Sequence, residues 1–238
     1  EYSKNLKPFL KKVSFFFLPI AVVLLMLEII VFFSGEFMPI KKVVNLQNYG
    51  GKEIIFGREI ADQSMRKYKY LNVLSKKPEV LVLGSSRVMQ IREEMFDVNT
   101  KFYNAGGIAH NIADLVDFIR LLPDDVKPDT IILGIDFYWF GDKSDLIYGV
   151  SDDLKKIDDA YRWQAHLYVD RFLLSQIIRD PSYIIKIFNK EDSIGGEVPI
   201  GLQALSGDGF RNDGSYQYGS YIQESEKGIV YIDREKTL

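Results

Sequence analysis

Cysteine is absent from the 238 residues, and histidine occurs only twice, at His110 and His166. Without thiolates the chain forms no disulfide, Cys-ligated zinc site, iron–sulfur cluster or thiol nucleophile, and two histidines do not suffice for a histidine-rich metal centre. An excess of positive charge is lacking too, because 30 Lys and Arg residues face 33 Asp and Glu residues, for a net charge of -3. We therefore expect no metal site, no cofactor and no nucleic-acid partner.

Apolar residues make up 47% of the chain, but they are concentrated near the N-terminus. From Phe15 to Phe33 the sequence reads FFFLPIAVVLLMLEIIVFF. Nineteen helical residues span roughly 28 Å, close to the ~30 Å hydrocarbon thickness of a bilayer. The Leu, Ile, Val and Phe residues together favour insertion by about 5–9 kcal/mol, which outweighs a cost of about 3 kcal/mol for Glu28. The sequence predicts a transmembrane helix over residues 14–34, in contact with the lipid bilayer.

Two further features of this segment bear on the anchor and its orientation. A cleaved signal peptide would have a shorter apolar core and a small-residue cleavage site, which are not found here. Four lysines precede the segment and two follow it closely (Lys4, Lys7, Lys11 and Lys12; Lys41 and Lys42). The positive-inside bias then places residues 1–13 in the cytoplasm and the main domain outside it. Glu28 is either a carboxylate near the membrane interface or a contact to another membrane protein.

The rest of the chain reads as a connector over residues 35–75 and an α/β domain over residues 76–238. Short apolar runs at 79–83, 101–103 and 130–133 predict strands, and helical patterns at 88–96 and 111–122 lie between them. This alternation favours a parallel sheet covered by helices on both faces, a three-layer domain. Residues 151–190 read as helices separated at Pro181, residues 195–219 as a surface loop, and residues 228–232 as extended. Three strands are few for such a fold, so we expect the domain to be truncated.

Each predicted strand ends in small and polar residues: GSSR at 84–87, NAGG at 104–107 and GID at 134–136. In open parallel sheets, ligands bind beyond the carboxyl ends of the strands. A serine between a strand and a helix N-terminus exposes its hydroxyl beside backbone N–H groups, as an acyl-transfer nucleophile and its oxyanion hole require. The alternative is a phosphate-binding or purely structural turn, since Gly and Ser are common at such junctions.

The ordered set LVLGSSR, FYNAGG and IILGIDF resembles blocks I, II and III of the SGNH (GDSL-type) hydrolase superfamily, over residues 78–140. With one membrane anchor ahead of it, the chain is most similar to the membrane-anchored branch that modifies cell-envelope polymers. The resemblance implies a three-layer α/β fold with Ser86 as the nucleophile, and Ser85 in place of the family's aspartate. It also implies that the Gly106 N–H serves the oxyanion hole, with Asn104 preceding it as in the family's N-x-G form.

Two departures from the family pattern affect the mechanism. Asp136 replaces the block III asparagine; an ionised Asp136 would repel an oxyanion, whereas a protonated one would donate a hydrogen bond to it. The Asp-x-x-His of block V, which supplies the general base, does not occur in this chain. His110 is a candidate at the mouth of the crevice or a surface histidine at a helix start, and His166 reads as structural. A base from outside this chain is therefore expected.

Other residues near the strand ends are candidates for binding. Arg87 would steer an anionic substrate or pair with Glu93 or Glu94, and Tyr138 and Trp139 would stack on sugar rings or pack the loop. The acidic pairs Asp152-Asp153 and Asp158-Asp159 read as a solvated helix face, and the tyrosine-bearing stretch 208–219 as a loop on the glycan side.

The sequence thus predicts an extracytoplasmic, membrane-anchored serine esterase or O-acyltransferase. The expected substrates are acetyl-like esters of a cell-envelope glycan, or another acyl-carrying molecule. The alternative is a non-catalytic scaffold with the same fold, docked to a multi-pass membrane acyltransferase through the helix that carries Glu28.

Overall fold

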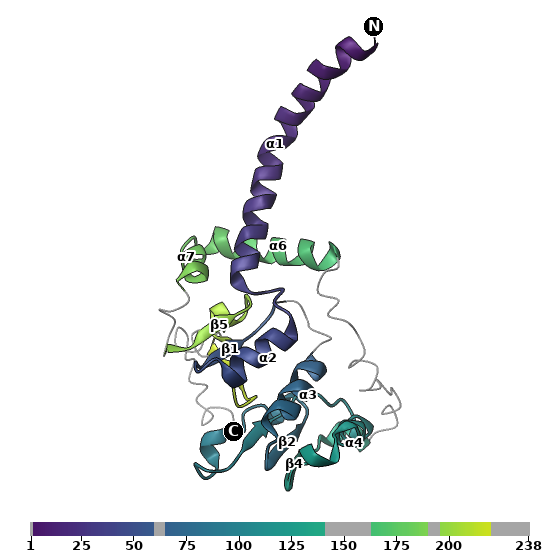
Figure 1. Ribbon diagram of the computed structural model, residues 1–238, viewed down its shortest axis with the longest axis vertical. Helices are drawn as coiled ribbons and strands as arrows, with labels where there is room; N and C mark the ends of the chain where they lie inside the picture. The colour runs from purple at the N-terminus through teal and green to yellow at the C-terminus, as the bar shows by residue number, and fades with distance from the viewer. Residues whose placement is uncertain (1, 60–64, 141–162, 190–195, 220–238) are drawn as a thin grey trace, which may run out of the picture.

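The computed structural model describes residues 2–59, 65–140, 163–189 and 196–219, and its elements form an N-terminal helix and a two-sheet domain (Figure 1). The α-helices are α1 (Tyr2–Ser34), α2 (Ile40–Tyr49), α3 (Met65–Lys76), α4 (Ile112–Leu121), α6 (Trp163–Arg179) and α7 (Tyr183–Phe188). The strands are β1 (Ile54–Phe56), β2 (Val80–Gly84), β3 (Phe102–Asn104), β4 (Thr130–Gly134), β5 (Val198–Ile200), β6 (Asp208–Phe210) and β7 (Tyr216–Tyr218). Short 3-10 helices include η1 (Ser86–Val88), η2 (Glu93–Met95), η3 (Asp124–Val126), η4 (Phe137–Phe140) and η8 (Ala204–Ser206).

The three predicted strands form one parallel sheet in the order β3-β2-β4. Leu81 and Leu83 of β2 are fully buried and pack with α3 and α4, whose apolar residues recur at helical spacing. The helix α4 begins where Asn111 caps it, because the Asn111 side chain accepts a hydrogen bond from the Asp114 N–H at 2.9 Å. The coarse expectation of an α/β fold with parallel strands is confirmed.

The region expected to be helical at 88–96 contains no α-helix. Only the two three-residue 3-10 helices η1 and η2 form there, joined by a loop. The helical reading failed because the side chain of Asn104 binds this loop, as its amide Nδ2 donates to the carbonyl oxygens of Val88 and Ile91 at 2.8 Å each. Backbone groups that a helix would pair internally are thus paired with a neighbouring strand.

A second, four-stranded sheet of order β5-β1-β6-β7 lies between the parallel sheet and the helices α6 and α7 (Figure 1). β1 pairs in parallel with β5 and antiparallel with β6, which joins residues more than 140 positions apart in sequence. The stretch 35–75, read as a connector, supplies α2, β1 and most of α3. The stretch 195–219, read as a surface loop, supplies β5, β6 and β7, so that expectation was wrong. The predicted run 228–232 lies outside the described residues.

The helix α1 extends away from the domain, and only its last turns are covered (Figure 1). Pro8–Ser34 is long and apolar enough to cross a membrane, and most of its side chains are exposed. Immediately after it, the buried Glu36 carboxylate accepts the N–H groups of Glu59 and Leu202, each at 2.8 Å. This carboxylate ties the base of α1 to the segments that follow the neighbouring parallel strands β1 and β5, which fixes the helix relative to the domain.

Candidate functional site

Ser86 lies where the sequence placed it, at the carboxyl end of the central strand β2, and its side chain is exposed. Ser85 precedes it as the cap of η1, and its hydroxyl accepts a hydrogen bond from the Arg87 N–H at 3.3 Å. The helix that begins here has three residues, so it supplies none of the dipole that a long helix would direct at Ser86. What the geometry provides is an exposed hydroxyl on a tight turn at the open edge of the sheet.

Asp136 comes to the same edge from β4 and is buried. Hydrogen bonds from Ser85 and Tyr138, together with the positive charge of Arg87, hold the pKa of Asp136 below its ordinary value although burial acts the other way. The Arg87 Nε lies 3.3 Å from Asp136 Oδ1. Asp136 is therefore ionised near neutral pH and has no proton to donate to an oxyanion. These contacts favour a role of Asp136 in positioning the 85–87 turn over a role as an oxyanion donor.

Asn104 and Gly106 come from the end of β3, on the other side of β2. The Gly106 N–H donates to the side-chain oxygen of Asn104 at 2.7 Å, and the Asn104 amide holds the loop after η1. Both residues thus lie at the expected edge. Both are engaged in hydrogen bonds within the protein, so an oxyanion at this position would have to replace Asn104 as the acceptor of the Gly106 N–H.

The glycines that end the three strand segments share a packing role around Val88. A Cβ on Gly134 would lie 2.0 Å from Val88 Cγ1, and one on Gly106 would lie 2.7 Å from Val88 Cγ2. At Gly84, whose φ is +159°, a Cβ would approach Val88 Cγ2 to 3.0 Å and the Gly134 carbonyl oxygen to 2.8 Å. Gly84, Gly106 and Gly134 therefore leave the space that the Val88 side chain fills. This places η1, and with it Ser86, over the ends of all three strands.

The remaining predicted site residues are spread over different surroundings. Trp139 is buried in the core beneath the sheet edge, so its ring is not available for stacking on a sugar. Tyr138 is exposed, and its ring centre lies 6.0 Å from the Arg87 guanidinium carbon. His110 is exposed, and within the described ranges its ring makes no hydrogen bond, although its backbone N–H donates to Asp114 at 2.8 Å. Arg87 binds Asp136, not Glu93 or Glu94.

Two other polar features were noted in the sequence, the His166 and Glu28 side chains and two acidic pairs. His166 lies on α6, and its Nδ1 is 3.1 Å from Glu28 Oε1, so Glu28 has a partner within the chain. The ring of His166 also stacks on Phe37, with 4.3 Å between ring centres. The pairs Asp152-Asp153 and Asp158-Asp159 lie outside the described residues. Within the described part of the chain, no cluster of three or more acidic or histidine side chains is placed to hold a metal ion.

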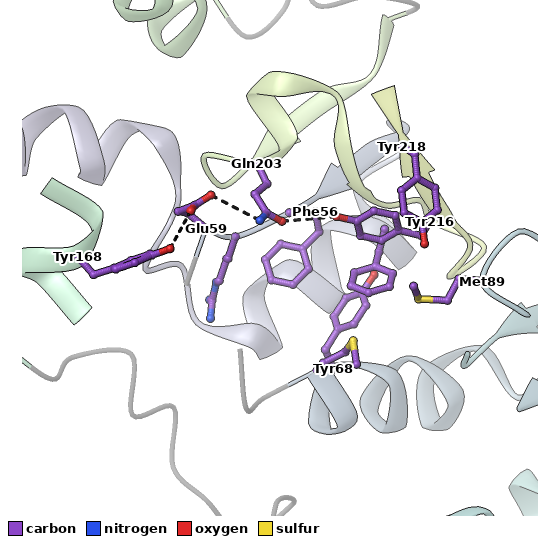
Figure 2. Close-up of a pocket in the computed structure, with 12 residues that line it drawn as sticks. Phe56, Glu59, Tyr68, Met89, Tyr168, Gln203, Tyr216 and Tyr218 are labelled. Atoms are coloured by element: carbon purple, nitrogen blue, oxygen red, sulfur yellow. Dashed lines mark hydrogen bonds between the residues drawn. The ribbon is translucent and has the colours of Figure 1, made fainter. Parts of the chain in front are cut away.

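A pocket of about 480 Å³ that the sequence did not predict lies beside this edge (Figure 2). Aromatic side chains dominate its lining, and Met89, from the loop after η1, closes one side. Tyr216 and Tyr218 belong to the tyrosine-bearing stretch noted in the sequence, and the Tyr216 N–H donates to the Met89 carbonyl oxygen at 2.8 Å. The aromatic rings of Phe56, Tyr68, Phe210, Tyr216 and Tyr218 come from α3 and three strands of the mixed sheet.

Glu59 is the acidic group of this pocket. Burial raises its pKa, although it accepts hydrogen bonds from the Tyr168 hydroxyl at 3.2 Å and the Gln203 amide at 3.5 Å (Figure 2). Burial also raises the pKa of Tyr216 to about 12, so this phenol stays neutral. Apolar rings with a few polar groups at one end are typical of a site for a small organic ligand.

Comparison with known proteins gives no match to this chain, whether the comparison is with protein-family models, with curated proteins or with solved structures.

Proposed function

We propose that this protein is a membrane-anchored serine esterase or O-acyltransferase, with its main domain outside the cytoplasm, that acts on acetyl-like esters of a cell-envelope glycan. The observation that supports this proposal is the exposed Ser86 hydroxyl at the carboxyl end of β2, on a turn held by Val88 and by the Ser85–Asp136–Arg87 contacts. Such an edge is where parallel sheets bind their ligands.

In the proposed reaction the Ser86 Oγ attacks the acyl carbonyl carbon and forms a new C–O bond. The ester C–O bond then breaks, and the alcohol leaves with a proton. Water or a second sugar hydroxyl next attacks the acyl-serine and releases Ser86. The proton of Ser86 must pass to a base, because a neutral hydroxyl is a weak nucleophile. His110 is exposed after β3, and His166 is occupied by Glu28, so a partner or another segment is the expected source of the base.

The aromatic pocket suits the non-reacting part of such a substrate. The pocket residue Met89 directly follows η1, so the pocket begins three residues along the chain from Ser86. Tyrosine rings offer flat apolar surfaces to a sugar, and Glu59 and Gln203 offer hydrogen-bonding groups at the far end.

A non-catalytic scaffold or partner subunit of a multi-pass acyltransferase is the second candidate. It is favoured by one observation, that the Gly106 N–H already donates to Asn104 and is not free at the edge. In this case Ser86 would be a turn residue, and the edge of the sheet would serve docking and not acyl transfer.

Replacement of Ser86 separates these two functions. With the whole protein in lipid nanodiscs, Ser86→Ala should abolish labelling by a fluorophosphonate probe and release of nitrophenol from p-nitrophenyl acetate. Ser175→Ala, which removes an exposed serine hydroxyl on α6, is the matched control and should leave both signals unchanged. Equal labelling of the Ser86→Ala and unsubstituted proteins would exclude Ser86 as the nucleophile.

A further inference from the structure

The apolar run of α1 is about as long as a bilayer core is thick. Phe15–Phe33 has nineteen residues, and at 1.5 Å per residue this corresponds to ~28 Å against a hydrocarbon thickness of ~30 Å, so the last turns of α1 lie near one face of the bilayer. Side chains from Phe15 to Met26 are exposed on nearly every side, whereas Leu27, Val31 and Ser34 are buried by other elements of the chain. The last two turns of α1 are therefore covered by protein on one side, close to the level at which a membrane passes from hydrocarbon to headgroups.

The elements that cover these turns are α6 and α7, which lie across the base of α1 at the end of the domain from which α1 projects (Figure 1). Val169 and Leu173 of α6 are fully buried and belong to the same apolar cluster as Leu27 and Val31. Phe188 of α7 contacts Phe33 of α1, with 5.3 Å between ring centres. A helix that crosses a membrane along its normal would hold α6 and α7 parallel to the membrane plane at this level.

The sides of α6 and α7 turned away from this cluster carry exposed apolar side chains among the basic residues Arg171, Arg179 and Lys186. On α6, Leu174 and Ile178 are one turn apart and 40% and 82% exposed; on α7, Ile185 and Phe188 are 60% and 50% exposed. Phe188 makes this surface continuous with the exposed Phe33 of α1. Arg171 stands three residues before Leu174 on the same side of α6, where its long side chain can reach phosphate groups.

We propose that this outer surface, formed by Leu174, Ile178, Ile185 and Phe188, lies in the headgroup region of the membrane that α1 spans. It is an interfacial platform of two short helices that holds the domain at a fixed orientation to the lipid. The proposal rests on the proposed membrane anchoring of α1. Lipid is the occupant because α1 brings it to this level and because the apolar surface runs directly into the side of the anchor. Apolar helix faces beside a basic residue are typical of helices that bind in this region.

The lack of native cysteine allows this depth to be measured at single sites. Ile178→Cys and Phe188→Cys, each labelled with a nitroxide in the whole protein, would be reconstituted in phosphatidylcholine–phosphatidylglycerol vesicles. Val98→Cys is the control in water, because Val98 is 99% exposed on the parallel-sheet half of the domain, and Leu25→Cys on the exposed part of α1 is the control in lipid. Accessibility to oxygen reports contact with lipid, and accessibility to a water-soluble nickel chelate reports contact with water.

We expect the labels at 178 and 188 to lose accessibility to the nickel chelate and gain accessibility to oxygen relative to Val98→Cys. A water-like label at 178 and 188 with a lipid-like label at 25 would overturn the platform and leave the anchor intact. A water-like label at 25 would instead overturn the anchoring itself. Protection at 178 that disappears when the protein is diluted with excess lipid would identify a second copy of the chain as the occupant and overturn the proposal.

Discussion

The parallel sheet β3-β2-β4 presents its polar side chains at an open edge, whereas the mixed sheet β5-β1-β6-β7 presents them inside an aromatic pocket. The parallel sheet is formed by one continuous stretch, residues 80–134, and its strand ends bring Ser86, Asn104 and Asp136 together. The mixed sheet combines residues 54–56 with residues 198–218. Its pocket therefore depends on contacts between distant segments, whereas the strands that form the edge come from one stretch of the chain.

The pKa values of Asp136 at the edge and Glu59 in the pocket are shifted in opposite directions. Hydrogen bonds from Ser85 and Tyr138 and the charge of Arg87 lower the pKa of Asp136, while burial raises the pKa of Glu59 in spite of its two hydrogen-bond donors. The same functional group is held as an anion at one site and is easier to protonate at the other. The edge is thus suited to fixed charge and polar chemistry, and the pocket to holding a largely uncharged molecule.

The largest change in the free energy of unfolding is expected when the buried ion pair behind the parallel sheet is broken. Arg66 Nη2 lies 3.1 Å from Asp114 Oδ2, and both side chains are nearly inaccessible. Arg66→Met should lower the free energy of unfolding by about 3–5 kcal/mol, because it leaves Asp114 as an unpaired buried charge. Urea unfolding of the detergent-solubilised protein measures this loss.

An exposed ion pair of the same sheet is the matched control. Lys101 Nζ lies 3.6 Å from Glu79 Oε1, with both side chains in solvent, and Lys101→Met should cost no more than about 1 kcal/mol. Similar losses in the two variants would contradict the claim that burial decides the strength of these contacts.

The second largest loss of stability is expected when a side chain is added at a glycine that contacts Val88. Gly134→Ala places a Cβ 2.0 Å from Val88 Cγ1, and overpacking of this kind costs about 1–3 kcal/mol. Val88→Ala removes the opposing methyl groups, so the double variant Val88→Ala/Gly134→Ala should lose less than the sum of the two single losses. Thermal unfolding of the four proteins gives the coupling; strictly additive losses would mean that the two positions do not share this space.

The parallel sheet could be predicted from the sequence because its strands come from one contiguous stretch of the chain. Runs such as EVLVL and TIIL, each ended by a glycine, predicted β2 and β4. Their parallel pairing followed from the helical patterns expected between the strands, of which only 111–122 forms an α-helix. The location of Ser86 and Asp136 at one edge followed from the same rule. The mixed sheet was not predictable in this way, because β1 pairs with strands more than 140 positions away in sequence, and these segments come together only in the folded chain.

The role of individual site residues was equally hard to infer from spacing. Tyr138 and Trp139 are neighbours in sequence, yet one is exposed and the other is in the core, because successive residues of η4 point in different directions. Lys69 is fully buried, and its ammonium group donates to the carbonyl oxygens of Asn104 and Gly214, which joins the two sheets. A lysine in a polar helical stretch gives no sign of such a position, since lysines are normally exposed.

A smaller effect is expected in the mixed sheet. The buried Tyr68 hydroxyl donates to Gln47 Oε1 at 2.8 Å, while the Gln47 amide donates to the carbonyl oxygens of Ile54 and Phe210. Tyr68→Phe should lower stability by about 1 kcal/mol, because it removes one buried hydrogen bond and leaves the ring in place. Tyr49→Phe, which removes an exposed hydroxyl next to Ser75, is the control and should leave urea unfolding unchanged. Equal losses in the two variants would show that burial of the Tyr68 hydrogen bond adds nothing to its contribution.

The smallest expected effect, and the one that compares the two sites directly, is a pair of pKa changes. Ser85→Ala removes the main donor to Asp136, and Tyr168→Phe removes a donor to Glu59, so both carboxyl pKa values should rise. Titration of ¹³C-labelled Asp and Glu side chains by NMR in micelles measures each shift.

The two carboxyl groups should also affect stability with opposite signs. Because the pKa of Asp136 is lowered on folding, its contribution is complete above the unfolded value of about 3.9 and is lost as the pH falls through the folded value. The pKa of Glu59 is raised, so its contribution is complete below the unfolded value of about 4.3 and is lost as the pH rises through the folded value. Ser85→Ala should therefore reduce the loss of folding stability at acid pH that comes from Asp136. Tyr168→Phe should widen the pH range over which Glu59 binds a proton more tightly in the folded protein than in the unfolded one. Equal pKa displacements of Asp136 and Glu59 in the same direction from their ordinary values, in the unsubstituted protein, would show that the edge and the pocket offer the same environment to a carboxylate, and the contrast between the two sheets would not hold.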